Sequence, residues 1–232
     1  MMVFKQLKRL ITNSSWLVKV VLLIVISIEL ALWTFGRLYP IDSEIYFSLL
    51  SPIAISGGSL PILFIFLSVY LKNPPLFEKI RQPRRFEFKL CMLFILMSSF
   101  IISTVPIIIF IIMALLSNNI DIIKLDVILE IIIRHFMFLF VVGSIQYLGT
   151  LIMKNKYIIP CLLLGSFISL SFMTNYRLVS DIFIFTQPPI NNKGNGLPLL
   201  LLIPLFLFLS ILITATSYEI LMRKDTLGGY YD

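Results

Sequence analysis

The sequence predicts an all-α integral membrane protein, with a single transmembrane domain over residues 1–232 that contains six transmembrane helices. Composition is the first reason: 59% of the residues are hydrophobic, 13% are charged, and the mean hydropathy is +0.99. The second reason is the recurrence of long apolar runs, since ~20 helical residues cross a ~30 Å hydrocarbon core. The third is that no run alternates with the period of a strand, so helices are the expected spanning elements.

Residues 1–14 are predicted to form an amphipathic elbow helix in the membrane interface. Basic residues lie on one helical face, and such a helix is drawn to anionic lipid. A flexible basic leader is the alternative. No small-residue cleavage site follows the first apolar run, so we expect no cleavable signal peptide. The apolar face of the elbow helix consists of Val3, Leu7, Leu10 and Ile11.

Six apolar runs are predicted to span the membrane. Prolines and glycines interrupt several of these runs, for example at Pro106 and Pro204. Neighbouring helices can cover the backbone groups that such residues leave without partners. The predicted spans are Trp16–Phe35, Phe47–Leu71, Leu90–Leu116, Val127–Met153, Tyr157–Asn175 and Leu197–Leu221.

Lysine and arginine are distributed unequally over the predicted loops. Of the 19 such residues, 13 fall on the side that holds both termini, four fall on the other side, and Lys19 and Arg134 lie within spans. Because loops rich in Lys and Arg stay in the cytoplasm, both termini are predicted to be cytoplasmic. The abundance of Ile, Asn and Lys is typical of an AT-rich bacterial genome. We therefore expect a multi-pass protein of a bacterial cytoplasmic membrane.

The loop between the second and third spans, residues 72–89, has the sequence KNPPLFEKIRQPRRFEFK. Topology explains its six basic residues. Topology does not explain why Leu76, Phe77 and Ile80 recur at helical spacing between two proline breaks. This pattern predicts a short amphipathic helix on the cytoplasmic surface, whose apolar face can dock in the groove of a partner.

The longest external segment is predicted at residues 176–196. Its piece SDIFIF is too short to span a membrane and too apolar for open water. We expect a short re-entrant or interfacial segment against the outer leaflet, followed by a Pro-Pro turn and a polar NNKGNG loop.

Glu29 and Arg134 are the charged residues predicted to lie deepest in the bilayer. Each sits roughly 10 Å below the outer boundary by helical rise. A charge at that depth usually has a partner or lines a water-filled cavity. We hypothesise an ion pair between Glu29 and Arg134, with contact to substrate as the alternative. For His135, a hydrogen-bonded packing role is favoured over proton relay, which needs further titrating groups.

Motifs of catalysis and of cofactor binding are absent from the sequence. It contains one histidine and neither a Walker-type phosphate loop nor a GxSxG or HExxH motif. We interpret Cys91 and Cys161 as packing residues, because neither has the spacing of a metal ligand. The net charge of +7 lies in short loops beside apolar runs, which favours topology over nucleic-acid binding. We expect no enzyme, no metal and no cofactor in this chain.

The segment Arg81–Lys89, RQPRRFEFK, resembles the segment before the third transmembrane helix of ABC-2-type transporter permeases. In that family an Arg-x-Pro or similar motif precedes Ser/Arg-Arg, an aromatic or acidic residue, and a Lys entering the helix. Here Gln82 is inserted and Arg84 replaces the usual small residue. The elbow helix, six spans, cytoplasmic termini, apolar piece before the last span and short basic tail also resemble this family.

The resemblance implies a permease that pairs with an identical or related subunit and works with a separate ABC ATPase, which binds ATP and Mg. In the family the second-to-third-span loop docks on this ATPase. The resemblance also implies export of amphipathic peptides or other lipid-partitioned substrates from a Gram-positive bacterium, including peptide-resistance roles. The implied coupling residues are Leu76, Phe77, Lys79, Ile80 and Arg81, with Arg84, Arg85 and Lys89 bordering the contact and the lipid headgroups.

Two other function classes stay open. A membrane-embedded enzyme needs a nucleophile with a base, or paired carboxylates, within the bundle. The residues considered for that role are Glu29, Arg134 and His135, with no second acid in the bundle interior. A non-transporting immunity or assembly protein would bind its target without an ATPase. Co-purification with an ATPase discriminates between these classes.

Overall fold

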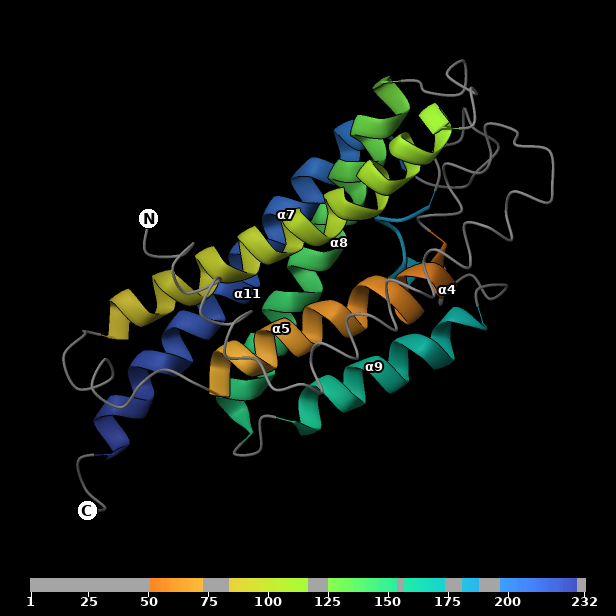
Figure 1. The fold of residues 1–232 in the computed structure, drawn as a ribbon. Helices are drawn as coiled ribbons and strands as arrows, with labels where there is room; N and C mark the ends of the chain where they lie inside the picture. Colours follow the sequence, from red (N-terminus) through yellow and green to blue (C-terminus); the bar gives the residue numbers. More distant parts are fainter. Residues whose placement is uncertain are drawn as a thin grey trace.

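The computed structural model describes residues 51–72, 84–116, 125–153, 157–173, 181–187 and 197–228. All regular elements in these ranges are helical, which confirms the all-α class for the described part of the chain. The predicted first span, the predicted elbow helix and residues 73–83 of the predicted cytoplasmic loop lie outside it. The elements are α4 (Pro52–Ala54), the π-helix η1 (Ile55–Ser59), α5 (Leu60–Lys72), α7 (Arg84–Leu116), α8 (Leu125–Ile152), α9 (Ile158–Ser171) and α11 (Leu199–Gly228) (Figure 1).

Within the described residues, two helices are long and apolar enough to cross a membrane. The stretches that meet this criterion are Arg85–Ile108 in α7 and Leu199–Arg223 in α11. The stretches Pro52–Ser68 and Ile158–Ser171 are shorter apolar helices. The predicted runs from the second to the sixth therefore all coincide with helices, and α7 and α11 have the length and apolarity of spans.

The helices extend beyond the apolar runs that predicted them. α7 begins at Arg84, whereas the predicted span begins at Leu90. Hydropathy marks only the apolar part of a helix, while the preceding RRFEFK contains no helix breaker and follows Pro83, a residue common at helix starts. α11 likewise continues to Gly228, beyond the predicted end at Leu221.

α8 is the central helix of the described bundle. It packs most extensively against α11 and α7, and it also contacts α5 and α9. In Figure 1, α7, α8 and α11 run along one side of the bundle, and α5 and α9 run along the other. Consecutive helices reverse direction, so the end of α5, the start of α7, the end of α8 and the end of α11 lie toward the same end of the bundle. We call this end the α7-start end.

Three helices approach one another closely at Gly143 in the middle of α8. A Cβ atom at this position would lie 3.1 Å from Cγ2 of Ile95, 3.4 Å from Cδ1 of Leu67 and 3.5 Å from Cδ2 of Leu63. These neighbours come from α7 and α5 and belong to the main buried apolar cluster. The absence of a side chain at Gly143 therefore lets three helices meet, as small residues do in membrane bundles.

The predicted helix interruptions are accommodated without ending the helices. Ser51 caps α4 by accepting a hydrogen bond from the backbone N–H of Ala54 at 3.2 Å, with Pro52 in the first turn. The sequence ISGGS then forms η1, where the N–H of Leu60 bonds to the carbonyl of Ile55. Pro106 and Pro204 lie inside α7 and α11. A single π-helical turn inside an α-helical run is a frequent companion of functional sites.

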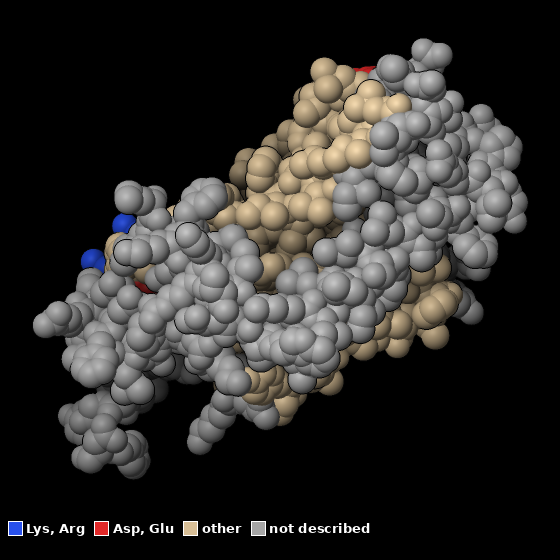
Figure 2. All heavy atoms as spheres, in the orientation of Figure 1, with Lys and Arg blue, Asp and Glu red and all other residues tan. Residues whose placement is uncertain are grey.

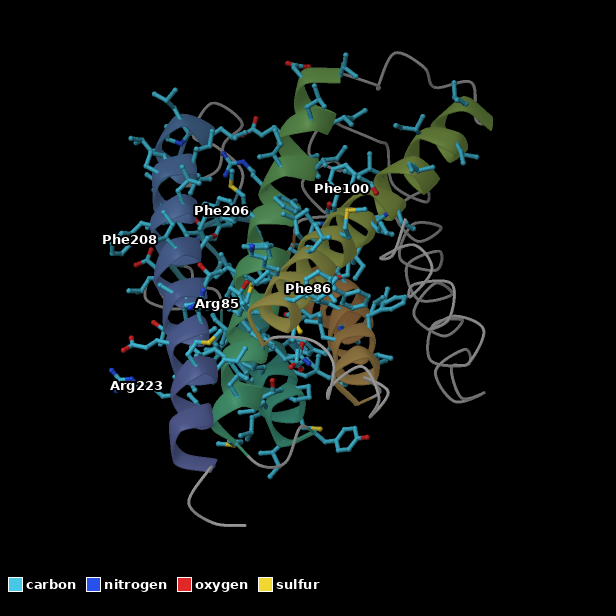
Figure 3. The ribbon with its side chains drawn as sticks, turned by 90° about the vertical axis from the view of Figure 1, so that its left-hand side faces the viewer. Arg85, Phe86, Phe100, Phe206, Phe208 and Arg223 are labelled. Atoms are coloured by element: carbon cyan, nitrogen blue, oxygen red, sulfur yellow. The ribbon has the colours of Figure 1, made fainter. Side chains whose placement is uncertain are left out.

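α11 contacts the bundle through a narrow stripe. Leu202, Ser217 and Leu221 are buried, and Phe206 packs on Phe136 and Phe140 of α8. Most of the helix surface is exposed. In its apolar 18-residue stretch 11% of the residues are buried, against 44% in that of α7. Figure 3 shows Phe208 pointing away from the bundle.

Candidate functional site

Arg134 occupies the most polar position in the interior of the described bundle. Its side chain is 0% exposed, although it carries a full charge in the first half of α8. Four hydrogen-bonding contacts satisfy the guanidinium group. Nε donates to Oε1 of Glu130 at 2.8 Å, and Nη2 lies 2.7 Å from the same oxygen. Nη1 donates to the carbonyl of Gln187 at 3.0 Å, and Nη2 donates to that of Leu197 at 2.7 Å.

The two carbonyl partners of Arg134 lie outside α8, so its side chain connects separate segments of the chain. Gln187 ends the described segment 181–187, and Leu197 lies two residues before α11 begins. One guanidinium therefore ties α8 to the segment before α11 and to the entry of α11 itself. We call Glu130, Arg134 and these two carbonyls the Arg134 clamp. The planar fork of arginine suits this task, because it directs several donors to separate acceptors at once.

The segment 181–187 packs against α8 and α9 through aromatic side chains. Phe183 is 0% exposed, and its ring stacks on that of Phe138 with centroids 5.9 Å apart. It also meets Phe167 of α9 edge-on at 5.9 Å, and Phe167 meets Phe138 at 5.6 Å. The apolar character of SDIFIF thus serves burial against neighbouring helices. The segment is a short helical turn followed by further turns, held at its end by the clamp.

Glu130 was missed by the sequence analysis. The interior was expected to hold no second acid, but the Glu130 side chain is 22% exposed and pairs with the fully buried Arg134. The sequence spacing does indicate this pair, because a Glu four residues before an Arg on a helix is the favoured order for an ion pair. The carbonyls of Gln187 and Leu197 lie 53 and 63 residues further along the chain, and no local pattern reports them.

The structure describes only part of the other predicted sites. Glu29 lies outside the described residues, so the Glu29–Arg134 pair stays a prediction. The same holds for the coupling residues Leu76, Phe77, Lys79, Ile80 and Arg81, and for the elbow residues Val3, Leu7, Leu10 and Ile11.

The last residues of the predicted coupling loop, residues 84–89, form the first turns of α7. Arg85 is exposed, Phe86 is 37% exposed, and Figure 3 places both at the start of the helix. Phe88 turns inward instead. Its ring meets that of Tyr218 edge-on at 5.3 Å and that of Tyr147 at 6.3 Å. Two aromatic contacts of Phe88 therefore join the start of α7 to α8 and α11.

The described residues contain no cluster of potential metal ligands. No group of three or more His, Cys, Asp or Glu side chains comes together among them. Cys91 is buried in α7 and Cys161 is exposed on α9. A buried arginine whose donors are directed to a carboxylate and two carbonyls supports a structural or gating role, since it joins segments rather than activating a nucleophile.

Comparisons of the chain with protein-family models, with curated proteins and with solved structures gave no match.

Proposed function

We propose that this chain is the membrane-spanning subunit of an ATP-driven exporter of the ABC type, multi-pass in a bacterial cytoplasmic membrane, with both termini in the cytoplasm. A separate ATPase supplies hydrolysis of ATP with Mg, and a second permease, identical or related, completes the pathway. Two features support this proposal: the sequence resemblance of Arg81–Lys89 and the distribution of charge over the bundle.

The observation that carries the proposal is the distribution of charge over the bundle. α5 before Lys72, α7 after Lys89, α9, and α11 before Glu219 contain no charged residue. A charge-free middle with charge at the ends is what a bilayer requires of a bundle, because a charge in hydrocarbon is costly. Figure 2 shows tan atoms, which belong to residues other than Lys, Arg, Asp and Glu, between blue atoms with a little red at one end and red atoms at the other.

The sign of the charge differs between the two ends. The α7-start end has a basic excess, with Arg85, Lys89 and Arg223 against Glu87 and Glu219. The opposite end carries Asp126, Glu130 and Asp181, with Arg134 paired internally. Basic residues mark the cytoplasmic side of membrane proteins. This supports a cytoplasmic location for the α7-start end, where the predicted docking loop enters α7.

A coupling role requires a physical connection between the loop and the bundle, and Phe88 supplies one. It lies in the second turn of α7 and contacts Tyr147 of α8 and Tyr218 of α11. A force applied to the start of α7 by a bound ATPase would therefore reach the central helix and α11. The Arg134 clamp holds α8 and the entry of α11 together at the other end.

The substrate class follows from the resemblance and from the lateral surface. The exposed apolar faces of α7 and α11 are suited to acyl chains, and a substrate dissolved in the bilayer can approach along them. Amphipathic peptides are such substrates. We propose them as the transported class, with export from a Gram-positive bacterium as the direction.

The test is co-purification from the native host. A tagged chain extracted in mild detergent is expected to bring down an ATP-binding-cassette ATPase, and a carbonate-washed membrane fraction is expected to retain the chain. Replacing both Phe77 and Ile80 by Asp should abolish the association and leave membrane insertion intact. The matched control, with both residues changed to Leu, keeps the apolar face and should keep the ATPase. An ATPase that never co-purifies, or that stays bound to the double Asp variant, would contradict the proposal.

A further inference from the structure

Three buried polar atoms of α8 have no hydrogen-bond partner among the described residues. One is the hydroxyl Oγ of Ser144, and the other two belong to longer side chains, Nε2 of His135 and Oε1 of Gln146. His135 is 3% exposed and Gln146 is 0% exposed. A polar atom buried in an apolar bundle without a partner is strongly unfavourable, and each such atom in a native protein calls for an explanation. The clamp and the proposed coupling contact use neither side chain.

The two side chains lie on the same side of α8. They are eleven residues apart, which is about three turns of an α-helix and about 16 Å along its axis. At Gln146 this side faces α5, because Nε2 of Gln146 donates to the carbonyl of Phe64 at 3.4 Å and to Oγ of Ser68 at 3.3 Å. The orphaned atoms of His135 and Gln146 are therefore spaced along one face of the central helix.

Most other buried polar groups of the bundle find a partner nearby. Hydroxyl groups donate to the carbonyl three or four residues earlier in their own helix, as Ser98 does to Ile95 at 3.0 Å and Ser217 to Ile213 at 2.7 Å. A helix carbonyl can accept this second bond because it has two lone pairs. Most hydroxyls are thus satisfied without water, whereas those of Ser99, Ser144 and Ser210 have no partner among the described residues.

The amide oxygen of Gln146 cannot bond to a carbonyl of its own helix as a hydroxyl does, because it only accepts hydrogen bonds. It needs a donor, and the backbone N–H groups in the middle of a helix are already bonded to carbonyls of the same helix. Arg134, next to His135, is not that donor, because its nitrogen atoms point to Glu130, Gln187 and Leu197. A partner for Oε1 of Gln146 must therefore be a mobile donor or a side chain beyond the described residues. Nε2 of His135 needs a donor in one tautomer and an acceptor in the other.

We propose that water molecules bind inside the bundle at His135 and at Gln146, as two internal hydration sites along one face of α8. Water fits both positions because it donates and accepts. It satisfies either tautomer of His135 and either orientation of the Gln146 amide. A cation or a peptide N–H satisfies only an acceptor. Internal waters of this kind complete buried polar groups in many proteins.

The chain itself provides a reporter, because His135 is its single histidine. The whole protein, labelled with ¹⁵N-histidine and placed in phosphatidylglycerol–phosphatidylcholine bilayers, gives ring signals from one residue. Solid-state NMR that transfers magnetisation from water measures contact with water at those ring nitrogens. We expect transfer to Nε2 of His135 within a few milliseconds, and we expect it to survive washing of the bilayer surface with a paramagnetic relaxation agent.

Two results would overturn the proposal. One is a His135 ring that receives magnetisation no faster than the lipid-facing apolar side chains of α11, which would mean a dry site. The other is a change of its ring signals in a Glu29→Gln variant, with no water transfer, which would identify that carboxylate as the partner. Replacing Gln146 by Leu serves as the control for local effects: the His135 signals should keep their water contact, since the two sites are separate.

Discussion

Two ion pairs in this molecule have the same sequence pattern and opposite surroundings. Glu130 and Arg134 in α8, and Glu219 and Arg223 in α11, are both a Glu four residues before an Arg on one helix. The side chains of the first pair are 22% and 0% exposed, and those of the second are 61% and 75% exposed. Figure 3 shows Arg223 pointing away from the bundle. The same sequence pattern therefore contributes differently to stability, because the loss in free energy of unfolding on removing one partner depends on how buried the pair is.

The same contrast applies to the helices that carry these pairs. α8 is surrounded by other helices and holds the buried polar side chains Arg134, His135, Ser144 and Gln146. α11 is attached along one stripe and is apolar over most of its exposed surface. A central helix can bury polar groups because its neighbours offer partners, whereas a peripheral helix in a bilayer must be apolar outside.

The largest expected effect is the loss of the clamp in an Arg134→Ala variant. The charge of Glu130 would face an apolar interior, and two carbonyls would lose their donor. Removing one partner of a buried ion pair costs about 3–5 kcal/mol, and we expect the free energy of unfolding in mixed detergent micelles to fall by about that amount. Arg134→Lys should recover part of the loss, because it keeps the charge without the planar fork. A loss no larger than that of Arg223→Ala would contradict the clamp.

The aromatic cluster at Phe183 is expected to come next. Truncation to Ala leaves a cavity between α8, α9 and the segment 181–187, at a cost of about 3 kcal/mol in the same unfolding measurement. Phe208 on α11 is the matched control, because it is 63% exposed, and its replacement by Ala should change stability within about 0.5 kcal/mol. Equal losses at the two positions would show that Phe183 is not packed as described.

Two glycine substitutions compare the centre of the bundle with its edge. At Gly143 a new methyl group meets Ile95, Leu67 and Leu63, so Gly143→Ala should cost about 1 kcal/mol as overpacking outweighs the gain in helix propensity. At Gly165 in α9 no atom lies within 4 Å of the new Cβ, so Gly165→Ala should raise stability by up to about 1 kcal/mol. The thermal unfolding midpoint measures both; a shift of the same sign in the two variants would contradict the packing at Gly143.

The smallest effect is expected at the exposed ion pair. Arg223→Ala should lower the free energy of unfolding by less than about 1 kcal/mol, because solvent screens a surface pair. Raising the salt concentration from 0.05 to 0.5 M should shrink the difference further. A loss that is larger and insensitive to salt would mean that Arg223 has a buried partner in the assembled protein.

Much of the architecture could be predicted from hydropathy and turn residues. The five predicted runs that fall in the described part of the chain all form helices, whereas the expected depth of Arg134 in a bilayer stays a prediction. Helix bounds were less accurate at α7 and α11, because charged residues continue a helix past its apolar part. Glu130 could have been found from its spacing to Arg134, since the pattern is local.

The sequence by itself determined the helical class, the apolar middle of each described helix and the concentration of basic residues near one end, since these depend on composition and on spacing within a few turns. The tertiary structure decided which side chains each helix buries. It placed α8 at the centre, brought the carbonyls of Gln187 and Leu197 to Arg134, and left α11 open on most of its surface. Contacts between residues more than fifty positions apart depend on how helices pack, and packing is set by the whole bundle rather than by any local pattern.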